Sequence, residues 1–405
     1  MKIELLWQRE RFADIFADAA KRLLEASSGK RFDIQWRKRS PIVSGDRDWV
    51  CSDRLNAIYW SRCGPLARSA VRKHYGNHER PTWAAVQRTY IALATSAAGE
   101  RVLARWLTID PQPALAADLV FRGGGQRIRM MDYAQKQVWA VAKAGRDARG
   151  VTSELAFRRQ LPGSFPAPRF IGSIDEGRGF CELLAPGVPL DQLGGDRAIE
   201  VRTAAETALG RLAQSKRRPV DASSYLTGLQ ARVEFDLASD LASETIRAVI
   251  GERFSAIARA LEERQAEGID LAPSHGDLSG DNVVADRDGF AITDWEMAGE
   301  RHIGFTWIES ATPGVRRPGF GRRLARTARN EPTAAALAAA RRLIGDASVV
   351  GDRRWREIAV LFYLAERLVI DAGTGLSAHL HRAGPELAAC ALEIEHALAA
   401  IGVEV

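Results

Sequence analysis

The chain predicts an α+β fold in which a small antiparallel sheet lies between two helical regions. Three observations indicate this: helical spacing of apolar residues up to about residue 118, strand-like patterning over 119–190, and alanine-rich helical patterns over 191–405. These ranges are taken as the domain organisation. A chain of 405 residues is long enough for one large domain or two to three smaller ones.

Composition excludes several classes of protein. An apolar fraction of 46% with 27% charged residues is ordinary for a soluble globular protein, and no run approaches the roughly 18 apolar residues of a membrane span. Four dispersed cysteines without a CxxC pair indicate reduced thiols and a cytoplasmic location. A net charge of +6 suits an anionic substrate, a nucleotide or peripheral contact with acidic lipids. The basic clusters lack interleaved aromatics, so no nucleic-acid partner is expected, and no feature indicates an oligomeric state.

Residues 1–118 are predicted to form a mostly helical N-terminal extension. Apolar residues repeat at helical spacing from Phe12 to Leu24, and a second long helical pattern runs from Trp83 to Leu107. The pattern ends at Asp110-Pro111. The segment contains no recognisable chemistry, and its tryptophan-rich faces are interpreted as packing surfaces.

Residues 119–190 change to strand patterning. The order is strand, glycine run, strand, tight turn, strand, helix and two further strands. The expected strands are Leu119–Arg122, Arg127–Asp132, Gln137–Lys143, Arg169–Ile174 and Gly179–Leu184, with a helix over Thr152–Leu161. A five-stranded antiparallel sheet with one helix fits this order.

Residues 191–405 are expected to be helical except for one β region. Long helical patterns cover Arg197–Gln214, Ser243–Ala266, Pro332–Ile344, Trp355–Ala372 and Pro385–Ile401. The exception is SHGDLSGDNVVADRDGFAITDWE, residues 274–296. In it, Val283-Val284 and Phe290–Thr293 flank Asp286–Gly289, which is the usual composition of a β-hairpin.

The acidic residues of this stretch do not form a calcium loop. With Gly289 at the sixth position of an EF-hand, Asp286 and Asp288 fall on the third and fifth. The first and twelfth positions would then be Val284 and Trp295, whose side chains cannot bind calcium. Asp286 and Asp288 are therefore assigned to the hairpin turn.

Asp277, Asn282 and Asp294 fit a site for metal-bound phosphate better. Transfer of phosphate from ATP to a hydroxyl needs one carboxylate to orient the hydroxyl and accept its proton, and further oxygen ligands for Mg²⁺. Asp277 and Asn282 have the Asp-x4-Asn spacing of a kinase catalytic loop. Asp294 follows a strand after the hairpin, where it could reach the same ion.

The motif His275-Gly-Asp-Leu-Ser-Gly-Asp-Asn282, followed by Ile292-Thr-Asp-Trp-Glu296, resembles the aminoglycoside phosphotransferase and choline kinase family. The resemblance implies a bilobal protein-kinase-like fold with a small β-sheet N-lobe and a helical C-lobe. It further implies that Asp277 is the catalytic base, that Asn282 and Asp294 bind Mg²⁺, and that His275 supports the loop. Where many members carry a second Asp, this chain reads Gly304-Phe-Thr-Trp307.

The same resemblance places the nucleotide-binding residues in the upstream sheet. Lys143 is expected to contact the phosphates and to pair with Glu154 on the following helix. Gly123, Gly124 and Gly125 would let backbone amides approach the phosphates. Leu183 and Leu184 would line the adenine pocket in the linker between the lobes.

The predicted function is an ATP- and Mg²⁺-dependent phosphotransferase that acts on a hydroxyl of a small molecule, sugar or glycan. The alternative is a nucleotide-binding pseudokinase that serves as a scaffold. The family resemblance covers about residues 119–310 with motifs and leaves the acceptor, the choice between ATP and GTP and the role of residues 1–118 open.

Overall fold

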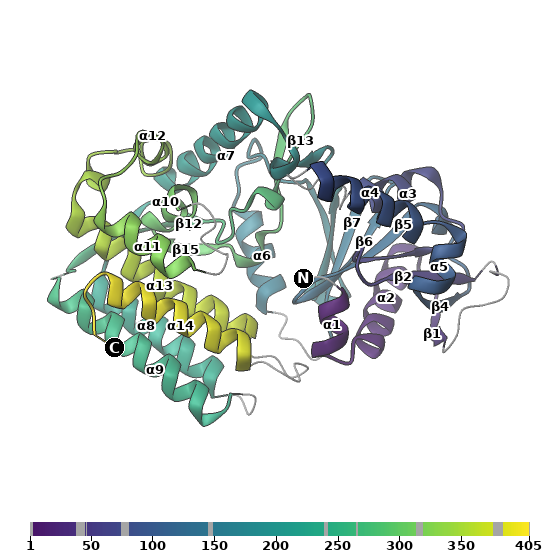
Figure 1. Ribbon diagram of the computed structural model, residues 1–405, viewed down its shortest axis with the longest axis horizontal. Helices are drawn as coiled ribbons and strands as arrows, with labels where there is room; N and C mark the ends of the chain where they lie inside the picture. Colours follow the sequence, from purple (N-terminus) through teal and green to yellow (C-terminus); the bar gives the residue numbers. More distant parts are fainter. Residues whose placement is uncertain are drawn as a thin grey trace. The chain divides into compact units, whose positions relative to one another are not determined.

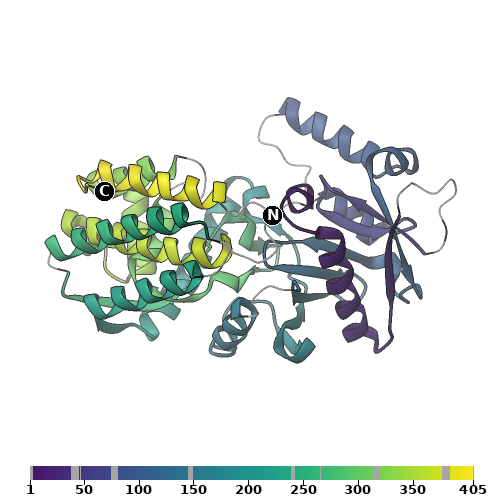
Figure 2. The ribbon, with the colours of Figure 1, turned by 90° about the horizontal axis from the view of Figure 1, so that it is seen from below.

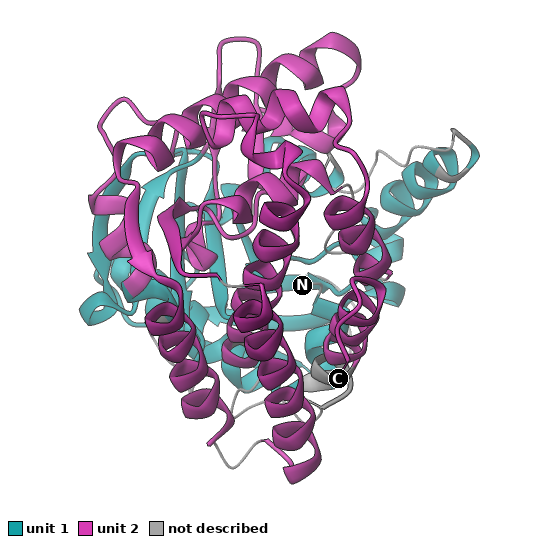
Figure 3. Ribbon diagram, turned by 90° about the vertical axis from the view of Figure 1, so that its left-hand side faces the viewer, with its two compact units in different colours: residues 1–152, 168–184, 379–381 teal, residues 153–167, 185–378, 382–405 magenta. Residues whose placement is uncertain are grey.

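The computed structural model describes residues 3–37, 45, 47–73, 81–144, 149–238, 242–264, 266–312, 319–375 and 384–404. The chain divides into two compact units, coloured separately in Figure 3. Unit 1 contains residues 1–152 and 168–184, and unit 2 contains residues 153–167, 185–378 and 382–405. Residues 1–118 and the strands after them fall in one compact unit in this division, and the domain boundaries expected at residues 118 and 190 stay predictions.

Unit 1 is built on a nine-stranded antiparallel sheet, counted over the described residues, with the order β1-β4-β2-β3-β5-β6-β7-β9-β8. Five of its strands are those predicted from residues 119–190: β5 (Leu119–Gly123), β6 (Arg127–Asp132), β7 (Gln137–Ala142), β8 (Phe170–Ile174) and β9 (Gly179–Leu183). The other four extend the sheet beyond β5: β1 (Asp33–Arg37), β2 (Asp48–Ser52), β3 (Ala57–Trp60) and β4 (Arg105–Asp110).

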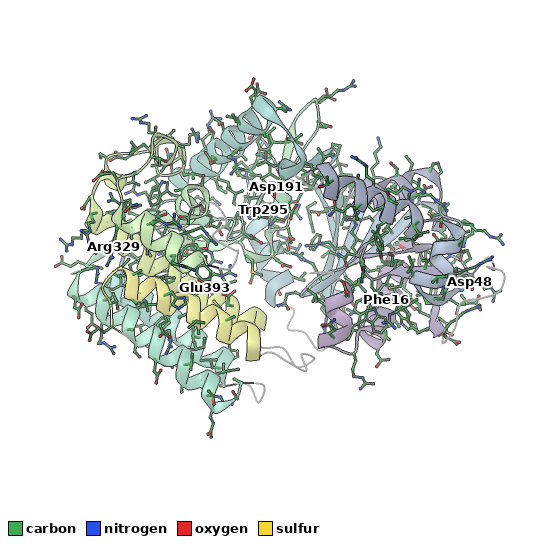
Figure 4. The ribbon with its side chains drawn as sticks, in the orientation of Figure 1. Phe16, Asp48, Asp191, Trp295, Arg329 and Glu393 are labelled. Carbon is green, nitrogen blue, oxygen red and sulfur yellow. The ribbon has the colours of Figure 1, made fainter. Side chains whose placement is uncertain are left out.

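Two N-terminal helices cover one face of this sheet. They are α1 (Ile3–Arg9) and α2 (Phe12–Ser28), and Figures 1 and 2 show α2 alongside the strands. The buried side of α2, which includes Phe16 (Figure 4), packs with Phe121 and Val141 in one apolar core. A second core on the sheet contains side chains from α3 (Pro65–Lys73) and α4 (Pro81–Ala94).

The predicted helix over Trp83–Leu107 is wrong in its second half. The helix α4 ends at Ala94, and α5 (Ala97–Leu103) begins after Ser96, whose side chain accepts a hydrogen bond from the Gly99 amide as an N-cap. Because an N-cap residue has extended backbone angles, it interrupts the helix. The last residues of the range belong to β4, which pairs with both β1 and β2.

Unit 2 is mainly helical, as predicted, and its core is continuous across the described helices. The five predicted helices are confirmed as α7 (Gly195–Ser215), α9 (Glu244–Glu263), α12 (Ala334–Leu343), α13 (Arg353–Gly375) and α14 (Gly384–Ala400). Three helices were not predicted: α8 (Ala222–Leu237), α10 (Gly304–Ala311) and α11 (Phe320–Arg329). Among the described residues, no helix is both long and apolar enough to cross a membrane.

Within the described residues, unit 2 also holds two small sheets, although a single β region had been predicted there. The predicted hairpin is confirmed as β13 (Val283–Ala285) and β14 (Phe290–Ile292), joined to β10 (Val188–Pro189). The second sheet is β11 (Arg218–Asp221), β12 (Gly268–Ser274) and β15 (Gly299–His302). Asp286 closes the hairpin turn, because its Oδ1 accepts hydrogen bonds from the amides of Asp288 and Gly289.

Candidate active site

The loop after β12 carries Asp277 and turns sharply at Gly276. Gly276 has φ +77°, and a Cβ added there would lie 2.0 Å from the carbonyl oxygen of Met297. Both the left-handed backbone and this close approach require glycine. The Gly276 amide donates to Oγ of Ser274 at 3.2 Å, which holds the turn against the end of β12.

Asp277 and Asn282 are joined directly. Nδ2 of Asn282 donates to the carbonyl oxygen of Asp277 at 2.9 Å, and the Ser279 amide donates to the same oxygen at 2.8 Å. Because the amide nitrogen is used in this bond, the side-chain oxygen of Asn282 points away from it and can act as a ligand. Asn282 is buried, and Asp277 is partly exposed.

Asp294 lies on the next segment, which hydrogen bonds tie to the same loop. The Thr293 amide donates to the Asn282 carbonyl at 2.8 Å. Asp294 adopts the left-handed conformation, with φ 62° and ψ 60°. A non-glycine residue in this conformation costs about 1–3 kcal/mol and is typical of functional sites. Trp295 follows it and is fully buried (Figure 4).

His275 links the two segments. Its Nδ1 accepts from the Asp277 amide at 3.3 Å, and its Nε2 contacts the Thr293 carbonyl oxygen at 2.8 Å. Because a carbonyl can only accept, the ring carries its hydrogen on Nε2. The ring is fully buried and packs edge-on against Trp295, with centroids 4.5 Å apart. These contacts place His275 between the two segments, and its supporting role stays a prediction.

Helix α10 supports the loop through two side chains. Oε2 of Glu309 accepts from the Leu278 amide at 3.2 Å, and Oγ1 of Thr306 lies 3.0 Å from Oγ of Ser274. Both Thr306 and Glu309 are buried. The loop is therefore anchored by a threonine and a glutamate of α10.

The residues of this loop fit a nucleotide-bound magnesium ion. Mg²⁺ in such sites is held by one or two carboxylates together with phosphate oxygens, not by a cage of protein ligands. Asn282 and Asp294 offer an amide oxygen and a carboxylate from two hydrogen-bonded segments. Among the described residues, no cluster of three or more His, Cys, Asp or Glu side chains suited to a metal is found.

In unit 1, Lys143 follows directly after β7. Its Nζ donates to Oε1 of Glu10, a residue of the link between α1 and α2, and both side chains are fully buried. The Lys143 amide also donates to the Gln126 carbonyl at 3.1 Å, next to the glycine run. Glu10 was not among the site residues predicted from the sequence.

Glu154 lies on α6 (Arg149–Arg159), which begins three residues before the predicted helix. It is buried and forms an ion pair with Arg158, one turn later on the same helix, at 3.7 Å. Lys143 belongs to unit 1 and Glu154 to unit 2. Their pairing stays a prediction.

The glycine run is less open than predicted. Gly123 ends β5, and a Cβ there would lie 2.7 Å from Cδ1 of Leu6 and 3.0 Å from Cγ1 of Ile3, so α1 packs on it. The Gly124 amide donates a hydrogen bond to the Arg127 carbonyl at 3.0 Å. Within the described residues, Gly125 is the member of the run with nothing within 4 Å of an added Cβ.

Leu183 and Leu184 are half-buried at the end of β9. Their amides already donate within unit 1, to the carbonyls of Arg169 at 2.9 Å and Lys136 at 2.8 Å. Any contact with an adenine would therefore use their side chains or carbonyls. Whether they line a nucleotide pocket stays a prediction.

Four residues were not predicted from the sequence: Glu10, which contacts Lys143 in unit 1, and Asp191, Thr306 and Glu309, which contact the loop of unit 2. Asp191 (labelled in Figure 4) lies against the catalytic loop, since a Cβ on Gly280 would lie 1.6 Å from its Oδ1. None of the four belongs to a recognisable motif. Their roles depend on contacts between residues far apart in the chain.

The loop of unit 2 thus holds an aspartate, an asparagine and a left-handed Asp294 on two hydrogen-bonded segments, which are the residue types expected of a phosphotransferase. Residues 78–305 match the phosphotransferase enzyme family, over more than half of the chain, and the protein belongs to this family. The order of elements, from an antiparallel sheet with a helix to a helical unit with a catalytic loop, is that of the protein-kinase-like fold.

Several solved structures are similar to the chain. A thermostable mutant of aminoglycoside phosphotransferase APH(4)-Ia is 16% identical, covers 70% of this chain and 94% of its own, and has a TM-score of 0.44. An ethanolamine kinase of Plasmodium vivax is 10% identical over 82% of this chain and 92% of its own, with a TM-score of 0.41. A choline kinase of Cryptosporidium parvum is 12% identical over 70% and 89%, with a TM-score of 0.40. No curated protein sequence matches the chain.

Proposed function

We propose that the protein transfers the γ-phosphate of ATP to a hydroxyl group of a small molecule, sugar or glycan. The observation that carries the proposal is the hydrogen-bonded pair of segments that holds Asp277, Asn282 and Asp294. In this proposal Asp277 orients the acceptor hydroxyl and takes its proton, and Lys143 contacts the phosphates of the nucleotide.

Asn282 and Asp294 would hold Mg²⁺, which when bound offsets the charge on the phosphates. The chain's own contribution is positioning. Hydrogen bonds of Asn282, Thr293 and His275 join the loop to the following segment. The carboxylate of Asp277 and the two proposed ligands therefore keep a defined separation. The basic surface and free cysteines agree with a cytoplasmic enzyme that acts on anionic nucleotides.

The test is an acceptor screen followed by release of ADP in the presence of Mg²⁺. Once an acceptor is found, Asp277→Asn should lower kcat by at least about 10²-fold while MgATP binding survives, because positioned general bases contribute about 10²–10⁴-fold. The matched control is Asp288→Asn, which removes the same charge from an exposed turn of the adjacent hairpin. Unchanged turnover in Asp277→Asn would rule out its role as the base.

The alternative is a nucleotide-binding pseudokinase that acts as a scaffold. The same screen separates the two functions: MgATP binding measured by calorimetry, without ADP release on any acceptor offered, would favour the scaffold. Failure to bind MgATP would reject both.

A further inference from the structure

We propose that Glu10 is a positioning residue for Lys143, which makes the N-terminal helices α1 and α2 part of the nucleotide-binding half of the protein. The inference depends on the proposed function, in which Lys143 contacts phosphate. It starts from the ion pair between Oε1 of Glu10 and Nζ of Lys143, whose side chains are both fully buried.

A buried ammonium group is costly unless a carboxylate compensates it. An ammonium has three N–H donors, and the bond to Glu10 uses one of them. This bond restricts the long side chain of Lys143 to rotamers in which the remaining donors have a set direction. A lysine that must meet a phosphate gains from such preorganisation.

Glu10 is itself held in place on both sides. Its amide donates to the Leu6 carbonyl at 3.0 Å, and its carbonyl accepts from the Phe12 amide at 2.7 Å, so it forms the corner between α1 and α2. The start of α1 is tied to the glycine run: the Ile3 amide donates to Oδ1 of Asn56 at 3.2 Å, and Nδ2 of Asn56 donates to the Gly123 carbonyl at 3.1 Å.

Helix α2 holds the residue before the lysine as well. An Arg22 guanidinium nitrogen donates to the Ala142 carbonyl at 2.8 Å, and another pairs with Asp175 at 2.6 Å. The N-terminal segment thus binds two successive residues. Arg22 binds the backbone of Ala142, and Glu10 binds the side chain of Lys143. The glycine run and the lysine are both fixed by residues 3–22.

The experiment measures MgATP affinity by calorimetry in Glu10→Gln, which removes the charge and keeps the size. We expect the Kd to rise about tenfold at pH 7, the change that follows from losing about 1.4 kcal/mol of charge-assisted hydrogen bonding.

Two controls separate positioning from stability. Glu4→Gln removes an exposed carboxylate of α1 and should leave the Kd unchanged. Leu23→Ala opens a cavity in the buried side of α2 and lowers stability without changing either partner of the ion pair. If Leu23→Ala weakens MgATP binding as much as Glu10→Gln does, the effect is one of stability, and the proposal is overturned.

A double-mutant cycle with Lys143→Met tests the route of the effect. If Glu10 acts through Lys143, the double variant binds MgATP no more weakly than Lys143→Met alone; additive losses overturn the proposal. Removing both partners also avoids an uncompensated buried charge, so the double variant should fold. If the wild type does not bind MgATP, or if Lys143→Met binds it equally well, the proposed role of Lys143 fails. If only Glu10→Gln is without effect, the Glu10 inference fails and the proposed function stands.

Discussion

Replacing His275 with phenylalanine should loosen the connection between the catalytic loop and the segment of Asp294. Phenylalanine keeps a ring against Trp295 but removes one donor and one acceptor. The Thr293 carbonyl and the Asp277 amide would each lose a buried partner, at about 1–3 kcal/mol per group. Because the bond to the Asp277 amide is long, at 3.3 Å, we place the total loss near 2–4 kcal/mol.

Hydrogen–deuterium exchange of peptides covering residues 274–296 measures this change locally. His275→Phe should reduce the protection of this region more than that of the helices of unit 2. ADP release on an identified acceptor should fall by about 10²-fold, the cost of a misplacement near 1 Å. His396→Phe, at an exposed position on α14, is the control. Unchanged protection together with unchanged ADP release would refute the supporting role of His275.

Three further predictions concern unit 2. Gly276→Ala should destabilise unit 2 by about 2–5 kcal/mol, because it combines a positive φ with a clash against the Met297 carbonyl; urea unfolding checks this. Glu309→Leu leaves the Leu278 amide without its acceptor, so kcat should fall by a larger factor than the KM for ATP changes. Equal factors for kcat and KM would contradict this prediction. Burial raises the pKa of Glu366 to about 7. The unfolded chain then loses this proton first, so stability falls as pH rises from about 4.5 to 7, by up to about 1.4 kcal/mol per pH unit. Glu366→Gln should remove this pH dependence of the unfolding free energy. If the unfolding free energies of variant and wild type change in parallel over pH 5–8, the contribution of Glu366 is excluded.

The hairpin and the candidate site residues of 274–296 could be predicted from the sequence because they depend on residues close together in the chain. The hairpin turn at Asp286, the spacing of Asp277 and Asn282, and the strand before Asp294 all lie within one short stretch. The five strands of residues 119–190 were also predictable, since alternation and glycine turns mark them. By contrast, β1 to β4 were missed, because their pairing in the sheet depends on partners far along the chain.

The glycine run shows where a local interpretation goes wrong. Three successive glycines suggest an open loop, but the packing of α1 on Gly123 uses the missing side chain for a contact between elements. A sequence pattern cannot distinguish a glycine that faces a ligand from one that faces a helix. The structure leaves Gly125 as the open position, within the described residues.

The sequence by itself determined the family, the type of reaction to expect and the residues proposed to act in the loop, because these depend on residue types at short, regular spacings. Tertiary structure decided which groups hold those residues in place. Glu10 and Lys143 are 133 positions apart, and Leu278 and Glu309 are 31 apart. Such contacts arise when helices pack on the sheet and on the loop, and residue spacing along the chain carries no record of them.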